Sequence, residues 1–206
     1  DFNWNFQSSF AEDGKSKVVV NFADGSQRTR QTITKNNTDL TTIIGSSIYD
    51  FSGRPAVTVL PAPLPPAACQ NAGSLAQHSF LYVRELNVTP LAGFQGEVYS
   101  KLHFDVDQSP NSCLNIAAPM ENSSGASQYY SLNNPDQSGF QSYLPEADGY
   151  PYSQTEYTPD NTGRIKQQGG VGPEFQLLGG HATKYFYGAP EQIELDRLFG
   201  SEVGDA

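Results

Sequence analysis

The sequence predicts an all-β protein, a β-hairpin meander with one short helix near the C-terminus. Its composition favours strands and turns, because Gly (19), Pro (14), Tyr (11) and Phe (12) are abundant while 17% of the 206 residues are charged. Long helices need more Ala, Glu, Lys and Leu. Apolar and polar residues alternate in several short runs, as in strands with one buried face. Asp, Asn and Gly separate these runs at turn-like positions.

The length fits one domain or a contiguous piece of a larger one. The chain starts without Met and stops soon after a helix-like segment, so we expect a single all-β segment, 1–206, of a larger protein. Within it we distinguish the first hairpins (1–66), a loop-rich β insertion (67–150) and a last hairpin followed by the helix (151–206).

The net charge of the chain favours some classes of function over others. A formal net charge of -10 argues against nucleic-acid binding, which needs clustered Lys and Arg. The same acidity suits an extracellular or cell-surface protein and is compatible with calcium. No apolar run approaches the ~18 residues of a membrane-spanning helix, so we expect no membrane span.

The first predicted hairpins begin with aromatic residues at alternate positions. Phe2, Trp4 and Phe6 would share one face of a strand, and the Asp24-Gly25 step would close a hairpin further along. A turn-like Asn pair then leads to another strand, which continues the meander. The later strands predicted in this region are 18–22, 27–35 and 41–50.

Proline dominates the segment LPAPLPPAA at 60–68. Because proline lacks the N–H that a sheet ladder needs, we expect an extended crossing at a sheet edge. Strands resume at 79–86 and 97–106. Residues 107–150 are rich in Ser, Asn, Gly and Pro, with scattered aromatics, and predict a long ordered loop with short strands.

The last part of the chain predicts a strand–turn unit and then a helix. The unit lies at 154–170, and a Gly-rich stretch leads from it to ATKYFYG at 182–188. In APEQIELDRLFG (189–200), Pro190 suits the first helical position and Gly200 suits the stop.

Two segments share a turn pattern. In each, Tyr ends a strand, Asp starts a tight turn, Gly occupies a position open to positive φ, and Arg starts the return strand. Asp would cap backbone N–H groups, and Tyr would pack on the neighbouring repeat. The residues are Tyr49, Asp50, Gly53 and Arg54 in the first copy, and Tyr157, Asp160, Gly163 and Arg164 in the second.

This pattern resembles the Tyr-Asp-x-x-Gly-Arg repeat of Rhs proteins, teneurins and the toxin-encapsulating components of bacterial toxin complexes. The first copy matches fully, whereas the second has Thr-Pro inserted between Tyr157 and Asp160. Segments outside the motif look like the region preceding the repeats in large Rhs-type proteins of Bacteroidota. These segments are 24–37, 41–63, 155–172, 179–188 and 191–200.

The resemblance implies a spiral of hairpins that forms part of a hollow, toxin-enclosing shell or of a scaffold at the cell surface. Each hairpin of such a repeat buries its face only by stacking on its neighbours. The implied partners are therefore the remainder of the parent chain or other proteins.

One strand carries a pattern suited to calcium. His103, Asp105 and Asp107 alternate along it, so they would share one face, and Asn111 follows shortly after. The Gly and the distal Glu of an EF-hand are missing. We therefore favour an exposed polar strand face and expect no cofactor, with calcium as the alternative.

Cys69 and Cys113 are the only cysteines. In an exported protein they could pair and close a loop of ~45 residues, which the chain-entropy model values at ~4 kcal/mol. The sequence leaves the paired and the free state open.

Catalytic patterns are incomplete. The histidines are His78, His103 and His181; GxSxG is absent, and His181 follows two glycines, so we expect a structural role in a turn. The GGVG stretch at 169–172 completes no nucleotide-binding motif. Four carboxylates lie near tyrosines, as in a glycosidase, but only their separation would decide that chemistry. They are Glu146, Asp148, Glu156 and Asp160.

The sequence therefore favours a non-catalytic structural or interaction segment of a large secreted or surface protein, acting as shell, scaffold or adhesin. The main alternative is a carbohydrate-binding module with exposed Trp4 and tyrosines, and with calcium near Asp105 and Asp107. A weaker alternative is an enzyme or toxin fragment centred on His181.

Overall fold

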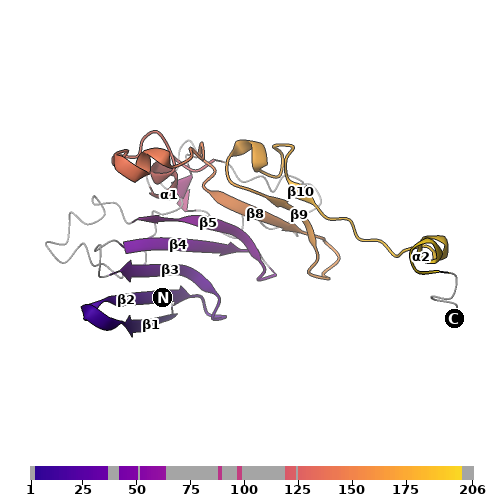
Figure 1. Ribbon diagram of the computed structural model, residues 1–206, viewed down its shortest axis with the longest axis horizontal. Helices are drawn as coiled ribbons and strands as arrows, with labels where there is room; N and C mark the ends of the chain where they lie inside the picture. Colours follow the sequence, from indigo (N-terminus) through magenta and orange to yellow (C-terminus); the bar gives the residue numbers. More distant parts are fainter. Residues whose placement is uncertain are drawn as a thin grey trace.

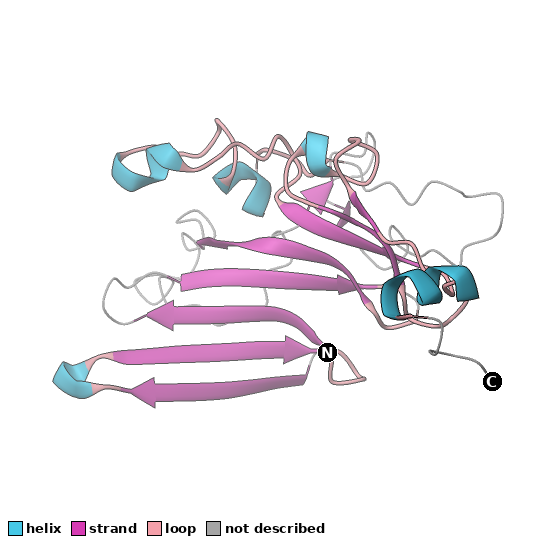
Figure 2. Cartoon of the chain, turned by 45° about the vertical axis from the view of Figure 1, so that its right-hand side comes forward, coloured by secondary structure: helices cyan, strands magenta, loops and turns pink. Residues whose placement is uncertain are grey.

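The fold is an open, eight-stranded antiparallel sheet with short helices (Figures 1 and 2). In the computed structural model, the described residues are 3–36, 42–50, 52–63, 88–89, 97–98, 119–123 and 125–200. The strand order, β1-β2-β3-β4-β5-β8-β9-β10, follows the chain, so the predicted all-β meander is confirmed. The strands are β1 (Asn3–Phe10), β2 (Ser16–Ala23), β3 (Thr29–Asn36), β4 (Thr42–Tyr49), β5 (Pro55–Pro63), β8 (Tyr152–Tyr157), β9 (Ile165–Gly169) and β10 (Thr183–Lys184).

A long connection separates two strands that are neighbours in the sheet. Residues 64–151 separate β5 from β8, yet the two strands pair directly, with Val57 opposite Gln154 and Val59 opposite Tyr152. A separate pair, β6 (Val88–Thr89) and β7 (Glu97–Val98), belongs to this connection. Of the strands predicted there, 79–86 lies outside the described residues, and so do residues 99–106 of the strand predicted at 97–106.

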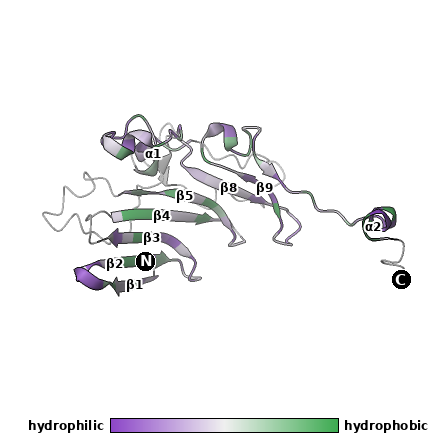
Figure 3. Ribbon diagram, in the orientation of Figure 1, coloured by the Kyte–Doolittle hydropathy of each residue, from purple (hydrophilic) through white to green (hydrophobic). Residues whose placement is uncertain are grey.

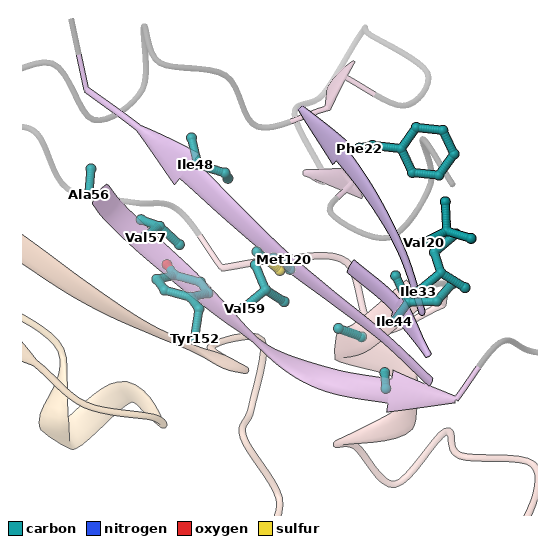
Figure 4. Packing of buried hydrophobic residues seen from close by; sticks show 12 residues of the cluster. Val20, Phe22, Ile33, Ile44, Ile48, Ala56, Val57, Val59, Met120 and Tyr152 are labelled. Carbon is teal, nitrogen blue, oxygen red and sulfur yellow. The ribbon is translucent and has the colours of Figure 1, made fainter. Parts of the chain in front are cut away.

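One face of the sheet carries the hydrophobic core. Val20, Ile33 and Ile44 lie side by side on three neighbouring strands, and Val59 pairs with Tyr152 further along. Figure 4 shows these side chains gathered over one face of the strands, and Figure 3 shows hydrophobic residues along β2, β4 and β5. Burying each large aliphatic side chain stabilises the fold by roughly 1.5–3 kcal/mol.

Short helices cover part of this face. Ala126 of α1 (Gly125–Tyr129) is fully buried against the core, and Met120 packs beside it. The 3-10 turns within the described residues are η1 (Glu12–Gly14), η6 (Gly139–Tyr143) and η7 (Pro173–Phe175). The expectation of a single helix was therefore wrong. Among the described residues, no helix is long and apolar enough to cross a membrane.

The expected short strands of 107–150 are absent from its described part, 119–123 and 125–150, which folds into helical turns. Polar side chains there bind nearby backbone groups: Asn134 Nδ2 donates to the Tyr129 carbonyl (3.0 Å), and Ser131 Oγ donates to the Gln128 carbonyl (3.0 Å). Such local bonds compete with sheet pairing, which explains the difference.

The start of the proline-rich segment lies inside the sheet rather than at its edge. Pro63 pairs with Ile43 of β4, and on the opposite side the Leu60 N–H donates to the Pro151 carbonyl (2.9 Å). The β4–β5 register shifts on either side of Gly45, which places two residues of β5 opposite one of β4. Such a bulge tolerates proline because the ladder is already interrupted.

The predicted C-terminal helix is α2 (Gln192–Phe199), which stands apart from the sheet in Figure 1. It begins later than expected, because Glu191 and Glu194 form a capping box in which the Glu191 N–H donates to Glu194 Oε2 (3.0 Å). Pro190 therefore precedes the cap instead of opening the helix. Gly200 ends the helix as predicted, and no α2 side chain is buried.

Candidate functional site

Three hairpin turns lie in a row along one end of the sheet (Figure 1). We call them the first ladder turn (24–28, between β2 and β3), the second ladder turn (50–54, between β4 and β5) and the third ladder turn (158–164, between β8 and β9). The second and third contain the two motif copies predicted from the sequence.

The second ladder turn is held by one buried carboxylate. Asp50 Oδ1 accepts the backbone N–H of Arg54 (2.8 Å), and Oδ2 accepts its Nε–H (2.7 Å). Two backbone hydrogen bonds close the turn: the Asp50 N–H donates to the Arg54 carbonyl (2.9 Å), and the Gly53 N–H donates to the Asp50 carbonyl (3.0 Å). Asp50 is 2% exposed, and Gly53 has a φ of 81°, a left-handed conformation that favours glycine.

The first ladder turn repeats this arrangement, although its sequence lacks the Tyr and Gly of the motif. Asp24 Oδ1 accepts the Arg28 N–H (3.1 Å), and Oδ2 accepts Arg28 Nε–H (2.9 Å) and Arg30 Nε–H (3.1 Å). Gln27 holds the position of Gly53, with a φ of 60°. From the sequence we expected the Asp24-Gly25 step to close this hairpin; the Asp-x-x-x-Arg spacing alone would have found the copy.

The environment of Asp24 favours its charged form. Burial by itself raises the pKa of Asp24, but the backbone N–H groups of Arg28 and Ser26 and the charges of Arg28 and Arg30 outweigh it. The pKa of Asp24 therefore lies below its usual value. The carboxylate is a charged acceptor at neutral pH and holds two arginines in place.

The third ladder turn is longer and uses hydroxyl groups. Thr158 N–H donates to the Arg164 carbonyl (2.8 Å), which closes the loop. Asp160 accepts the hydroxyls of Thr158 (2.6 Å) and Thr162 (2.7 Å), and these bonds lower its pKa to about 2. Gly163 has a φ of 73°. The Thr-Pro insertion thus replaces the Asp–Arg pair with an Asp–Thr network.

The arginine that ends each of these turns lies over a tyrosine further along the sheet: Arg28 and Arg54 over a tyrosine of the next hairpin, and Arg164 over one in the segment after β10. The Arg28 and Arg30 guanidinium carbons are 5.2 and 5.1 Å from the ring centroid of Tyr49. The Tyr49 hydroxyl donates to the carbonyl of Thr29, the residue after Arg28 (3.0 Å). A cation over an aromatic face contributes roughly 0.5–2 kcal/mol, depending on desolvation.

The same step occurs twice more. The Arg54 guanidinium carbon lies 4.5 Å from the Tyr157 ring centroid, and Tyr157 donates to the Pro55 carbonyl (3.1 Å). The Arg164 guanidinium carbon lies 5.3 Å from the Tyr187 ring centroid. Tyr187 donates to the carbonyl after Arg164, that of Ile165 (2.9 Å). We call these three steps the arginine–tyrosine ladder. Tyr187 was not among the site residues predicted from the sequence.

A glycine contact adds a further link between the first two turns. A Cβ atom at Gly53 would collide with Nη1 of Arg28, so the glycine lets the preceding arginine lie close. The ladder therefore joins consecutive hairpins through stacking, hydroxyl hydrogen bonds and one close approach. Chemically, this arrangement fixes hairpins relative to one another.

The other candidate residues lie in simple surroundings or outside the described residues. His181 is exposed, and its ring centroid is 5.7 Å from that of Phe175. Glu156 pairs with Lys166 (2.8 Å) and accepts a hydrogen bond from Gln167. The GGVG stretch ends β9 and leads into η7.

Several predicted residues have no described position. Among the described residues, no group of three His, Cys, Asp or Glu is placed to hold a metal ion. Those outside the described residues are Cys69, His78, His103, Asp105, Asp107, Asn111 and Cys113.

A hollow of about 150 Å³ lies beside α1. Tyr129 and Tyr130, whose rings meet edge to face at 4.9 Å, line it together with Gln141 and Glu146. Gln141 Oε1 is buried and accepts no hydrogen bond within the described part of the chain. A buried acceptor without a donor is unfavourable, so this atom would favour a ligand or water that supplies one.

Comparison with protein-family models gives no match, and comparison with curated proteins gives none either.

Proposed function

We propose that this chain is a non-catalytic structural and interaction segment of a large secreted or surface protein of the Rhs type. The observation that carries the proposal is the arginine–tyrosine ladder. It ties the three hairpins together through Arg28 on Tyr49 and Arg54 on Tyr157. It ties the third hairpin to the segment after β10 through Arg164 on Tyr187. A protein that works through shape needs such fixed contacts between successive repeats.

The resemblance to the Tyr-Asp-x-x-Gly-Arg repeat supports this proposal. The tyrosine and arginine that define the motif have clear physical roles: arginine closes its own turn and receives the next tyrosine. The first and second ladder turns share the Asp–Arg geometry although only the second carries the full motif. A shared backbone solution with different residues is typical of structural repeats.

Carboxylates of the hairpins have structural roles in this proposal. Asp50 binds Arg54, Asp160 binds two threonines, and Glu156 binds Lys166. Of the four carboxylates near tyrosines, Glu156 and Asp160 are thereby bound to neighbours in their own hairpin.

The test is the size and location of the native protein. An antibody raised against this chain should detect a species much larger than 22.4 kDa in the producing cells. It should also label intact cells or the culture medium, and protease added outside the cells should remove that signal. A 22-kDa species confined to the cytoplasm, resistant to external protease, would overturn the proposal.

Carbohydrate binding is the second candidate, favoured by the hollow at Tyr129, Tyr130 and Gln141. Aromatic walls and an unpaired acceptor suit a sugar, which offers both apolar faces and hydroxyl donors. A glycan-array screen followed by titration would test it. Binding that Gln141→Leu abolishes would support this function, and no bound glycan would remove it.

A further inference from the structure

The strand at one end of the sheet, β1, has an unusual surface for an edge strand. Its sequence NWNFQSSF contains no charged residue and no proline. Three large aromatic side chains on it are exposed: Trp4 (67%), Phe6 (55%) and Phe10 (82%). Edge strands are usually protected by charges, proline, bulges or short length. At the opposite end of the sheet, β10 spans only two residues.

These aromatics extend the buried face of the sheet. Trp4 pairs with Phe22 and Phe6 pairs with Val20, and both partners on β2 belong to the core. Residues opposite each other in a pair point to the same face. Because side chains alternate between the two faces of a strand, Phe10 lies on this face too. The apolar face therefore continues past the core to the edge strand β1.

We propose that β1 pairs antiparallel with β1 of a second copy of this chain, which joins two sheets into one. The occupant is a second copy because a two-fold axis brings together strands without charge, and hence without like-charge repulsion. The outer backbone groups of β1 supply the hydrogen bonds of the new ladder. This inference depends on the sheet alone and goes beyond the proposed function.

The side-chain pattern selects one register. The aromatic side chains of both copies lie on the same face only if even-numbered residues of one β1 pair with even-numbered residues of the other. A slip of one residue would place the two sets on opposite faces. Overlap is greatest when Gln7 lies opposite Gln7 of the second copy. In that register each Trp4 lies opposite Phe10 of the other copy, a cross-strand aromatic pair.

The available area sets the expected affinity. With about 200 Å² per aromatic side chain, the exposed fractions of Trp4, Phe6 and Phe10 amount to about 400 Å² per copy. Two copies with their backbone edges then bury at most about 1,000 Å², at the lower end of specific interfaces. We expect a reversible dimer with a dissociation constant in the micromolar range.

Trp4, the only tryptophan, reports on this interface directly. Sedimentation velocity and fluorescence emission would be measured on the full chain across the micromolar range. The proposal expects the mass to rise from monomer to dimer and the emission to shift to shorter wavelength over the same concentrations. A monomer at all concentrations would overturn it, whether the emission stays at long wavelength or is blue-shifted throughout.

Phe10→Asp tests the register, because it puts a negative charge opposite the electron-rich ring of Trp4 of the second copy, where no cation–π contact can form. We expect this variant to remain monomeric with long-wavelength emission, while its far-UV circular dichroism is unchanged because Phe10 is exposed. Phe140→Asp is the matched control, since Phe140 is 94% exposed but lies in η6, away from β1. Equal weakening by both substitutions, or none by Phe10→Asp, would overturn the proposed pairing.

Discussion

The second and third ladder turns join strands at the same end of the sheet but are held by different groups. In the second, buried Asp50 forms an ion pair with Arg54, with 2.7 Å between Oδ2 and Nε. In the third, exposed Asp160 accepts hydroxyl groups, and Arg164 lies over Tyr187. The step from arginine to the next tyrosine is the same in both, whereas the bonds inside the turn differ.

This difference distinguishes two structural roles of the bonds in these hairpins. The bonds inside a turn fix the hairpin itself, and either a buried ion pair or a hydroxyl network can supply them. The ladder step fixes a hairpin on the next hairpin or, after the third ladder turn, on the segment that follows β10. It uses the same tyrosine hydroxyl–carbonyl bond each time, at 2.9–3.1 Å. We therefore expect substitutions in the second ladder turn to have larger effects than those in the third.

The largest expected effect is that of Asp50→Ala. It removes a buried carboxylate and leaves Arg54, whose side chain is 17% exposed, without its charged partner. Breaking such a pair costs about 3–5 kcal/mol of unfolding free energy. Urea denaturation followed by circular dichroism would measure it. Asp160→Ala is the control, and its effect should be clearly smaller because Asp160 is exposed; equal losses would contradict the comparison.

A second test compares Gly53→Ala with Gly163→Ala. Both glycines have positive φ, 81° and 73°, so alanine strains each turn by about 1–2 kcal/mol. At Gly53 the new Cβ must also displace Arg28 from its position, whereas nothing lies within 4 Å at Gly163. Gly53→Ala should therefore lower the urea midpoint more. A larger effect at Gly163 would remove the proposed link between the first two turns.

The pH dependence gives a smaller effect. Folding lowers the pKa of Asp24, and lowers that of Asp160 from 3.8 to about 2. Their stabilisation is complete above the unfolded pKa and is lost as the pH falls from there through the folded value. The urea concentration at the unfolding midpoint should therefore decrease when the pH is lowered below ~4. Asp160→Asn should flatten this acid limb, and an unchanged limb would contradict the pKa shift.

Tyr157 contributes to the loss of stability at alkaline pH. Its burial, followed by the charge of Asp50, raises its pKa above 10.0, although Arg54 acts in the opposite direction. Its stabilisation is complete below the unfolded pKa and is lost as the pH rises through the folded value. The urea midpoint should fall above pH ~10, and less so in Tyr157→Phe. An equally steep fall in this variant would assign the effect to other groups.

The smallest effect is expected from Gln27→Gly, which should stabilise the protein. Gln27 adopts a φ of 60° in the first ladder turn, a conformation that costs a non-glycine residue about 1 kcal/mol. Glycine relieves this strain but loses more chain entropy on folding, so the net gain is about 0.5 kcal/mol. Ser26→Gly, at an ordinary φ, should give no gain in the same denaturation experiment.

Much of the sheet could be predicted from local patterns. The strands 18–22, 27–35 and 41–50 fall within β2, β3 and β4 or overlap them closely, because alternation and Asp or Asn turns are short-range signals. The described helical turns within 125–150 were missed, since Ser and Asn suit both loops and local capping. Proline at 61 and 63 suggested an edge, whereas a bulge placed it inside the sheet.

The candidate site was only partly predictable. The motif residues around Asp50 and Asp160 were found from the sequence, but the copy at Asp24 was missed because it lacks Tyr and Gly. Its Asp–Arg spacing is the same, so the signal lay in two residues rather than four. Tyr187 gave no signal of its own, because no Asp turn follows it.

The sequence by itself determined where the hairpins of the sheet turn, because the Asp, Asn and Gly signals of a turn lie within a few neighbouring positions. Only the tertiary structure decided which tyrosine each arginine meets. Tyr157 donates to Pro55 although 102 positions separate them, and this contact exists because β8 lies beside β5. Strand order and register bring such groups together, and they are set by burial of the whole sheet face rather than by any local pattern.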